Sequence, residues 1–129
     1  MRLLVVFSVL AACGGEPKPL TAKPPNDQLI VGEYERKPPD GTTAVRFDRD
    51  GGVRLAHDKS KLDGETLASG SWKLEGDQLS LNYVNGMCAG GGTGLYKVVI
   101  SRLGIRFTKV EDACEQRAKI DGQIWHRIK

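Results

Sequence analysis

The sequence predicts an all-β fold, a small antiparallel up-and-down barrel of about eight short strands. From residue 29 onward, apolar and polar residues alternate with period two, which is typical of strands that bury one face. Glycine-containing turn signals such as Asp50-Gly51-Gly52 divide this pattern at hairpin lengths, and no long stretch has the 3.6-residue period of a helix. Because an open sheet of such strands would leave exposed edges, we expect the sheet to close; a two-sheet β-sandwich is the alternative.

The start of the chain predicts export. A Met-Arg pair is followed by an apolar run over residues 3–10, which is too short to span a bilayer. Residues 10–13, Leu-Ala-Ala-Cys, resemble the lipobox of bacterial lipoproteins. That resemblance implies cleavage just before Cys13 and attachment of lipid to the Cys13 sulfur. A plain secretory signal that is cut at another bond is the alternative.

The same resemblance implies a location. Gly14, rather than an aspartate, follows Cys13, as in lipoproteins that take the default route to the outer membrane of Gram-negative bacteria. We therefore expect a cell-envelope protein anchored by its lipid, on the periplasmic or the surface side of the outer membrane. The anchor would be stable, because several acyl chains bind a membrane far better than one.

Three segments are expected along the chain. Residues 1–12 form the signal peptide, residues 13–28 the lipidated cysteine and a tether, and residues 29–129 the barrel domain. The tether contains four prolines between positions 17 and 25, with Lys, Glu and Thr around them and no apolar periodicity. A role of these prolines in peptide recognition is the alternative to a spacer.

The strands follow from the alternation of side chains between turns. Val45 and Phe47 share one face of the second strand, and Trp72 and Leu74 share one face of the fourth, with polar or charged residues between them. Between the seventh and eighth strands, residues 110–119 are expected to contain a helical turn. The expected strands cover residues 29–35, 43–48, 53–55, 66–74, 79–83, 95–101, 105–110 and 123–128.

Two cysteines remain once Cys13 carries lipid, and an even number in an exported chain favours a disulfide. Cys88 and Cys114 flank the sixth and seventh expected strands. The chain therefore runs down one strand and back up the next between them, which places both cysteines at the same end of the sheet. We expect them to be bonded to each other.

Charge and composition exclude one class of partner. The chain carries 19 Lys and Arg against 16 Asp and Glu, a net charge of +3, and no run of like charge. This near-neutral balance gives no electrostatic basis for binding nucleic acid.

Several short motifs of the expected barrel are similar to the lipocalin-like members of the calycin group. Residues 29–34, Leu-Ile-Val-Gly-Glu-Tyr, resemble their first-strand Gly-x-Trp signature, with tyrosine in place of the usual tryptophan. Two further features resemble small lipocalin-like domains of bacterial envelope proteins. They are Gly-Ser-Trp at 70–72 and the C-terminal segments 112–117 and 125–127. The resemblance covers nearly all of the expected barrel. It implies that Arg127 on the last strand packs over Tyr34 on the first, and that the barrel holds a small apolar ligand.

The sequence offers no catalytic, metal or cofactor site that we would assign. No Gly-x-Ser-x-Gly elbow occurs, and we do not expect an enzyme. His57 follows Val53 and Leu55 in phase, which predicts that it points inward near the barrel mouth, without an identifiable catalytic partner set. His57 and His126 are far apart, and no thiolate pair accompanies them, so no zinc site is expected.

Two functions remain open, and we favour the first because the resemblance to lipocalin-like domains spans the whole barrel. The first is a binding module that takes a small apolar ligand, with Trp72, Tyr83, Tyr96 and His57 as the candidate lining residues. For each aromatic residue, packing in the core is the alternative. The second is an envelope protein that binds another protein, for instance as an inhibitor, with a filled barrel and no ligand.

Overall fold

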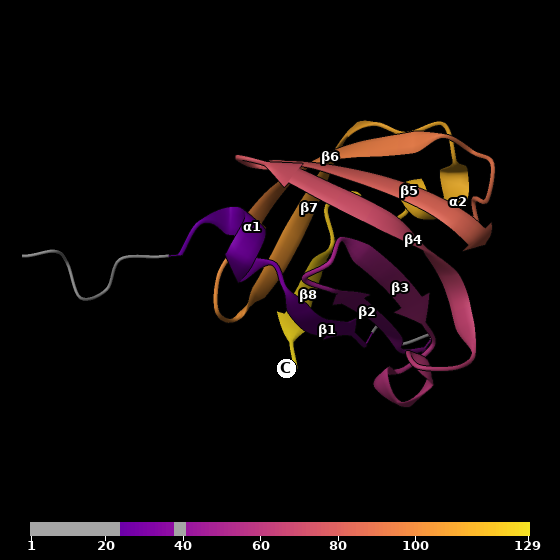
Figure 1. Cartoon of the computed structure of the whole chain (residues 1–129), viewed down its shortest axis with the longest axis horizontal. Helices are drawn as coiled ribbons and strands as arrows, with labels where there is room; N and C mark the ends of the chain where they lie inside the picture. The colour runs from indigo at the N-terminus through magenta and orange to yellow at the C-terminus, as the bar shows by residue number, and fades with distance from the viewer. Residues whose placement is uncertain (1–23, 38–40) are drawn as a thin grey trace, which may run out of the picture.

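The computed structural model describes residues 24–37 and 41–129, and these residues form one closed antiparallel barrel (Figure 1). The expected signal peptide, Cys13 and most of the tether lie outside the described residues. No helix among the described residues is long and apolar enough to cross a membrane. The strands are β1 (Gly32–Arg36), β2 (Thr43–Phe47), β3 (Gly52–Ala56), β4 (Thr66–Glu75), β5 (Gln78–Gly86), β6 (Thr93–Ile100), β7 (Gly104–Glu111) and β8 (Ile124–Arg127), and the helical segments are α1 (Asn26–Leu29), the 3₁₀ turn η2 (Lys59–Lys61) and α2 (Glu115–Ala118).

The barrel is of the up-and-down type that the sequence predicts. Each strand pairs antiparallel with the next, and β8 closes the sheet against β1 through the pairs Tyr34–Arg127 and Glu35–His126. The predicted all-β barrel of eight strands is therefore confirmed, and the sandwich alternative is not adopted. Closure therefore leaves no free edge strand for another chain to extend within the described part of the chain.

The two ends of the barrel differ. One end carries α1 together with the tight turns after β2, β4 and β6, and we call it the α1 end; Asn26 donates a hydrogen bond to the Gly76 carbonyl in the β4–β5 turn. The other end carries the β3–β4 and β5–β6 loops and α2, and we call it the disulfide end. Figure 1 shows α1 and α2 at opposite sides of the molecule.

The interior of the barrel is filled by the inward-facing residues of all eight strands. Its aromatic rings meet edge to face in two series, Tyr34–Phe47–Trp72 and Tyr96–Phe107–Trp125, with centroid distances of 5.9 to 6.4 Å. Such contacts favour a fixed core over a fluid one. Aliphatic side chains that are almost fully buried occupy the space between the rings: Val45, Val53, Leu55, Leu79, Leu81, Val98, Ile100 and Ile105.

Two local features differ from the expectation for the first strand and its approach. The expected tether ends in the short helix α1, and β1 begins at Gly32 rather than at residue 29. The cause is that Leu29 and Ile30 are buried as part of the end cap, where a helical turn satisfies their backbone better than an unpaired strand would.

His57 differs from its expected position at the barrel mouth, because it is exposed on the loop that follows β3. The alternation breaks before it, since the register between β3 and β4 shifts between Leu55 and Ala56. Beyond that shift, Ala56 and Ala44 are buried on the outer face of the sheet under Leu62, which the β3–β4 loop folds back over them.

We predict that Gly70→Ala destabilises the barrel. A Cβ atom at Gly70 would lie 1.9 Å from the Asn82 carbonyl oxygen and 2.8 Å from the Tyr83 Cα, both backbone atoms of the neighbouring strand. Relief requires β4 and β5 to move apart, which costs about 1 to 3 kcal/mol or more. Urea unfolding measures the loss. Gly64→Ala is the control, because its Cβ would meet nothing within 4 Å; equal stability of the two variants would contradict the packing described.

Candidate functional site

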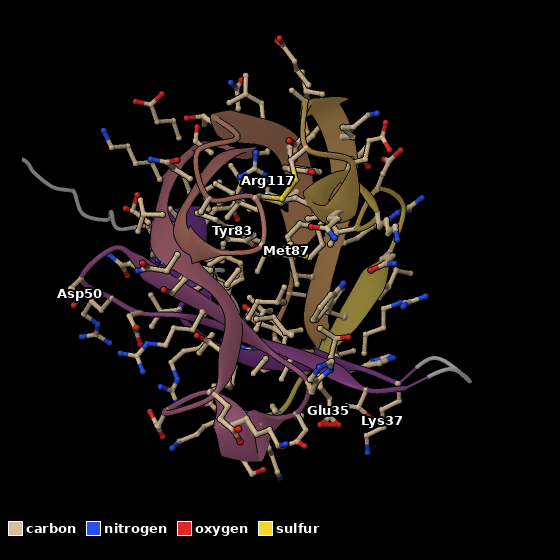
Figure 2. All side chains as sticks on the ribbon, turned by 90° about the vertical axis from the view of Figure 1, so that its right-hand side faces the viewer. Glu35, Lys37, Asp50, Tyr83, Met87 and Arg117 are labelled. Atoms are coloured by element: carbon tan, nitrogen blue, oxygen red, sulfur yellow. A yellow bond between two sulfur atoms is a disulfide. The ribbon has the colours of Figure 1, made fainter. Side chains whose placement is uncertain are left out.

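The disulfide end is closed from inside by a buried ion pair. Arg117 on α2 points into the barrel with a fully buried side chain (Figure 2). Its Nε donates to Asp112 Oδ2 at 2.7 Å and its Nη2 to Asp112 Oδ1 at 2.8 Å, a two-point contact. Nη2 also donates to the Gly92 carbonyl oxygen at 3.1 Å, which links the β5–β6 loop to the Asp112–Arg117 ion pair.

Neighbouring groups complete this cluster. Asp112 also accepts hydrogen bonds from the Tyr96 hydroxyl and the Cys114 backbone N–H. Burial alone would raise the pKa of Asp112, but the bonds from Arg117, Tyr96 and Cys114 hold that pKa below its usual range. The Asp112–Arg117 pair requires a glycine at position 94, because a Cβ atom there would lie 2.4 Å from Asp112 Oδ2. The guanidinium lies over the Tyr83 ring, 5.3 Å from its centroid.

A disulfide between Cys88 and Cys114 covers the cluster, as the strand arithmetic predicts. It joins the β5–β6 loop to the start of α2, with a Cα–Cα distance of 5.9 Å. Cys88 adopts a left-handed backbone conformation with φ of 66°, which turns the loop back over the barrel end. The same bond therefore holds both segments that close this end.

The α1 end is closed by the pair that the calycin resemblance implies. The Arg127 guanidinium lies over the Tyr34 ring, 4.7 Å from its centroid. Arg127 Nη2 donates to the carbonyl oxygens of Leu29 and Ser101, at 2.6 and 3.2 Å, and the Tyr34 hydroxyl donates to that of Ile30 at 2.8 Å. These bonds fasten α1 and the β6–β7 turn to the last strand.

The residues expected to line a ligand cavity are packed in the core. Trp72, Tyr83 and Tyr96 are 8%, 4% and 0% exposed, and each has a ring or a guanidinium against it. The linings of five hollows on the described residues include none of these three, nor His57. The structure therefore places the three aromatic residues in one packed interior. None of the five hollows opens between them.

Two of these hollows adjoin on the outside of the barrel, and sequence reasoning missed them. They share Ile124 and His126 on β8, whose outward side chains form a ridge between them. One hollow, of about 500 Å³, reaches Glu35 and Lys37 on β1, and the other, of about 270 Å³, reaches Val99 and the β6–β7 turn. The available signal was an apolar residue in the outward phase: Val99 lies between two inward residues, and Ile124 precedes inward Trp125.

We predict that the native protein shows no tyrosine ionisation at ordinary pH values for a phenol. Burial raises the pKa of Tyr34 and of Tyr83 to about 12, against the opposing charges of Arg127 and Arg117. Burial first, and then the bond to Asp112, also raise the pKa of Tyr96. These are all three tyrosines of the chain, so no exposed phenol contributes a background.

The unfolded chain loses its phenol protons near pH 10, whereas the folded chain keeps them. The tyrosines therefore contribute their full stability below about pH 10, and that contribution is lost as the pH rises toward about 12. Ultraviolet absorbance and the free energy of unfolding, both measured against pH, check this. A native titration with a midpoint near 10 would contradict the burial of the hydroxyl groups.

No protein-family model matches this chain, and no curated protein matches it. The closed antiparallel barrel is consistent with the calycin resemblance at the level of architecture. Among residues 24–37 and 41–129, no group of three or more His, Cys, Asp and Glu is placed to hold a metal ion.

Proposed function

We propose that this chain is a lipid-anchored envelope protein whose barrel is a solid module that binds another protein through its outer surface. The observation that carries the proposal is the filled interior, closed at one end by Arg117 and at the other by Arg127. This is the second of the two functions that the sequence leaves open.

The packing of the core favours this function over ligand binding. An eight-stranded barrel is only just wide enough to be filled by its own side chains, and a ligand requires that some of them be small. Here the inward positions hold two series of three aromatic rings, and the rings within each series contact one another. Entry of an apolar molecule would also have to displace the buried Asp112–Arg117 pair or the Tyr34–Arg127 pair, and both are tied to backbone carbonyls.

Export and anchoring are supported by separate observations. The Cys88–Cys114 disulfide fits an oxidising compartment such as the periplasm or cell surface. The Leu-Ala-Ala-Cys run at 10–13 supports lipid attachment at Cys13. A tether followed by a rigid barrel would present the outer surface of the barrel to other proteins of the envelope.

Cross-linking in intact cells tests the proposal. The full chain is treated with an amine-reactive cross-linker and recovered under denaturing conditions, and a protein adduct of reproducible mass is expected. Native mass spectrometry of the detergent-extracted chain is the companion measurement, with no bound small molecule expected. A chain that always carries one apolar molecule and forms no adduct would overturn the proposal in favour of ligand binding.

We predict that Cys13→Ser releases the protein from the membrane. Without the thiol no lipid can be attached at residue 13, and this lipid is the anchor that the sequence predicts. In a detergent phase-separation assay the wild-type chain should partition into the detergent phase and the variant into the aqueous phase. Ala12→Gly is a suitable control, because a small residue before the cysteine is kept. Equal partition of Cys13→Ser and wild type would show that the lipobox assignment is wrong.

A further inference from the structure

We propose that the outer surface of β6, β7 and β8 is the docking surface, and that its partner presents aliphatic side chains flanked by carboxylates. This inference rests on the proposed function and specifies where the partner binds and what chemistry it offers. We call this region the β8 surface and define it by Val99, Leu103, Arg106, Ile124 and His126.

Apolar side chains gather on the β8 surface. Leu103, Val99 and Ile124 are 82%, 65% and 55% exposed, and they are three of the five large hydrophobic residues that are exposed in the described part of the chain. All three line the same hollow, beside Gly104 on β7. Apolar residues that cluster in this way mark interaction sites, whereas single exposed ones need no explanation.

The barrel covers a comparable surface elsewhere. On the outer face of β2 and β3, Ala44 and Ala56 are fully buried because the β3–β4 loop lays Leu62 over them. Arg46 fixes that loop through Asp63, with an Nη1–Oδ1 distance of 2.6 Å. The connections beside the β8 surface are a tight turn after β6 and a helical turn after β7, and neither covers Val99, Leu103 or Ile124.

The charges around these residues are mainly positive. Arg106 stands between Val99 and Ile124 in the register of three adjacent strands, so its side chain projects from the middle of the β8 surface. In the adjoining hollow, Arg36 and Lys37 face Glu35, and Glu35 is engaged by Lys37 at 3.1 Å. Arg36, Lys37 and Arg106 outnumber Glu35, so the net charge here is positive. This positive charge attracts carboxylates and repels cations, which gives the surface its selectivity.

This charge pattern selects among occupants. A second copy of the chain docked about a two-fold axis would bring two Arg106 side chains together, and such like-charge contacts are unfavourable. A flat lipid surface would bury the protruding Leu103 but leave the hollow lined by Val99 and Ile124 unfilled, whereas side chains of a structured partner fill it. An acidic and aliphatic protein segment satisfies both the hollow and the charge.

Photo-crosslinking in cells tests the assignment. A photoreactive phenylalanine analogue replaces Val99 in one full-length variant and Val84 in a matched control; both are exposed valines, on β6 and β5. The Val99 position is expected to give a protein adduct and the Val84 position at most about a fifth of it, since contact energy is concentrated in one patch. Peptide mapping of the adduct should find a segment rich in Asp, Glu and aliphatic residues.

A charge reversal gives a second, independent measurement. Arg106→Glu is added to the variant that carries the photoreactive residue at position 99. It should lower the yield of the adduct at least about fivefold, because the new carboxylate repels the partner's carboxylates. Lys73→Glu, at an exposed position of β4, is the control and should leave the yield of the adduct unchanged. Retention of the adduct in Arg106→Glu, or a mapped segment without acids, would overturn the partner chemistry.

The other outcomes separate this inference from the proposed function. An adduct at Val84 alone overturns the β8 surface but leaves a protein partner. An adduct with twice the mass of this chain identifies a second copy, and an adduct with lipid identifies a membrane surface; either overturns the inference. If neither position reacts and native mass spectrometry finds a bound apolar molecule, the proposed function fails as well.

Discussion

Asp112→Ala is expected to lower the free energy of unfolding by about 3 to 5 kcal/mol, the range for removing one partner of a buried ion pair. The variant leaves the Arg117 guanidinium inside the barrel without its anion, and the Arg117 side chain has no exposed surface through which water could replace it. The Tyr96 hydroxyl and the Cys114 N–H lose their acceptor at the same time. Chemical denaturation of the soluble variant measures the loss.

Two further variants show whether burial is the cause. Asp77→Ala breaks an exposed pair with Lys97, whose side chain is 65% exposed, and should cost less than about 1 kcal/mol. The double variant Asp112→Leu/Arg117→Met removes both charges and should cost much less than the sum of the two single changes. A cost for Asp112→Ala no larger than that of Asp77→Ala would contradict the buried cluster.

Loss of the Cys88–Cys114 bond is expected to be comparably large. The bond closes a loop with a sequence separation of 26. A loop of that size is worth about 3 to 4 kcal/mol in the chain-entropy model. For a domain of this length, that corresponds to a fall in Tm of roughly 15 °C. Thermal unfolding of Cys88→Ser/Cys114→Ser, compared with that of the oxidised wild type, measures it.

Reductant supplies the control for this prediction. Reduction should lower the Tm of the wild type to nearly that of the double variant and should leave the double variant unchanged. If the wild type melts at the same temperature before and after reduction, the bond does not constrain the unfolded chain. Because the bond holds the β5–β6 loop against α2, its loss should also loosen the contact between Arg117 and the Gly92 carbonyl.

The strand content and the cysteine pairing were predictable because both depend on local, periodic information. Val45 and Phe47 alternate with polar residues, and Gly51 and Gly76 adopt positive φ values of 95° and 63° at the turns where the sequence places them. Once alternation and turns fix the direction of each strand, the parity of strands brings Cys88 and Cys114 to one end.

The buried arginines were not predictable from periodicity. Arg117 lies on a four-residue helix that has too little length to show an apolar face, and it is buried only because Asp112, Gly92 and Gly94 surround it in three dimensions. The resemblance of short motifs to calycins predicted the contact of Arg127 with Tyr34, whereas alternation alone did not. His57 was placed in the wrong environment because a shift in register after Leu55 has no signature in the sequence.

The β8 surface was missed for a different reason. Alternation sorts residues into inward and outward, and an apolar residue among outward ones, such as Val99, counts as noise when it is seen alone. Only the register of β6, β7 and β8 shows that Val99 and Ile124 flank the same arginine, Arg106.

The central claim is that the barrel is solid and that function resides on its outer surface. The most direct test is a titration of the protein with fatty acids and other apolar probes while the emission of Trp72 and Trp125, the two buried tryptophans, is followed. A filled barrel predicts no saturable change in emission at any probe concentration below the onset of probe micelles. A saturable change with one probe per chain, abolished by Trp72→Phe in a variant that still folds, would contradict the claim and establish a ligand cavity.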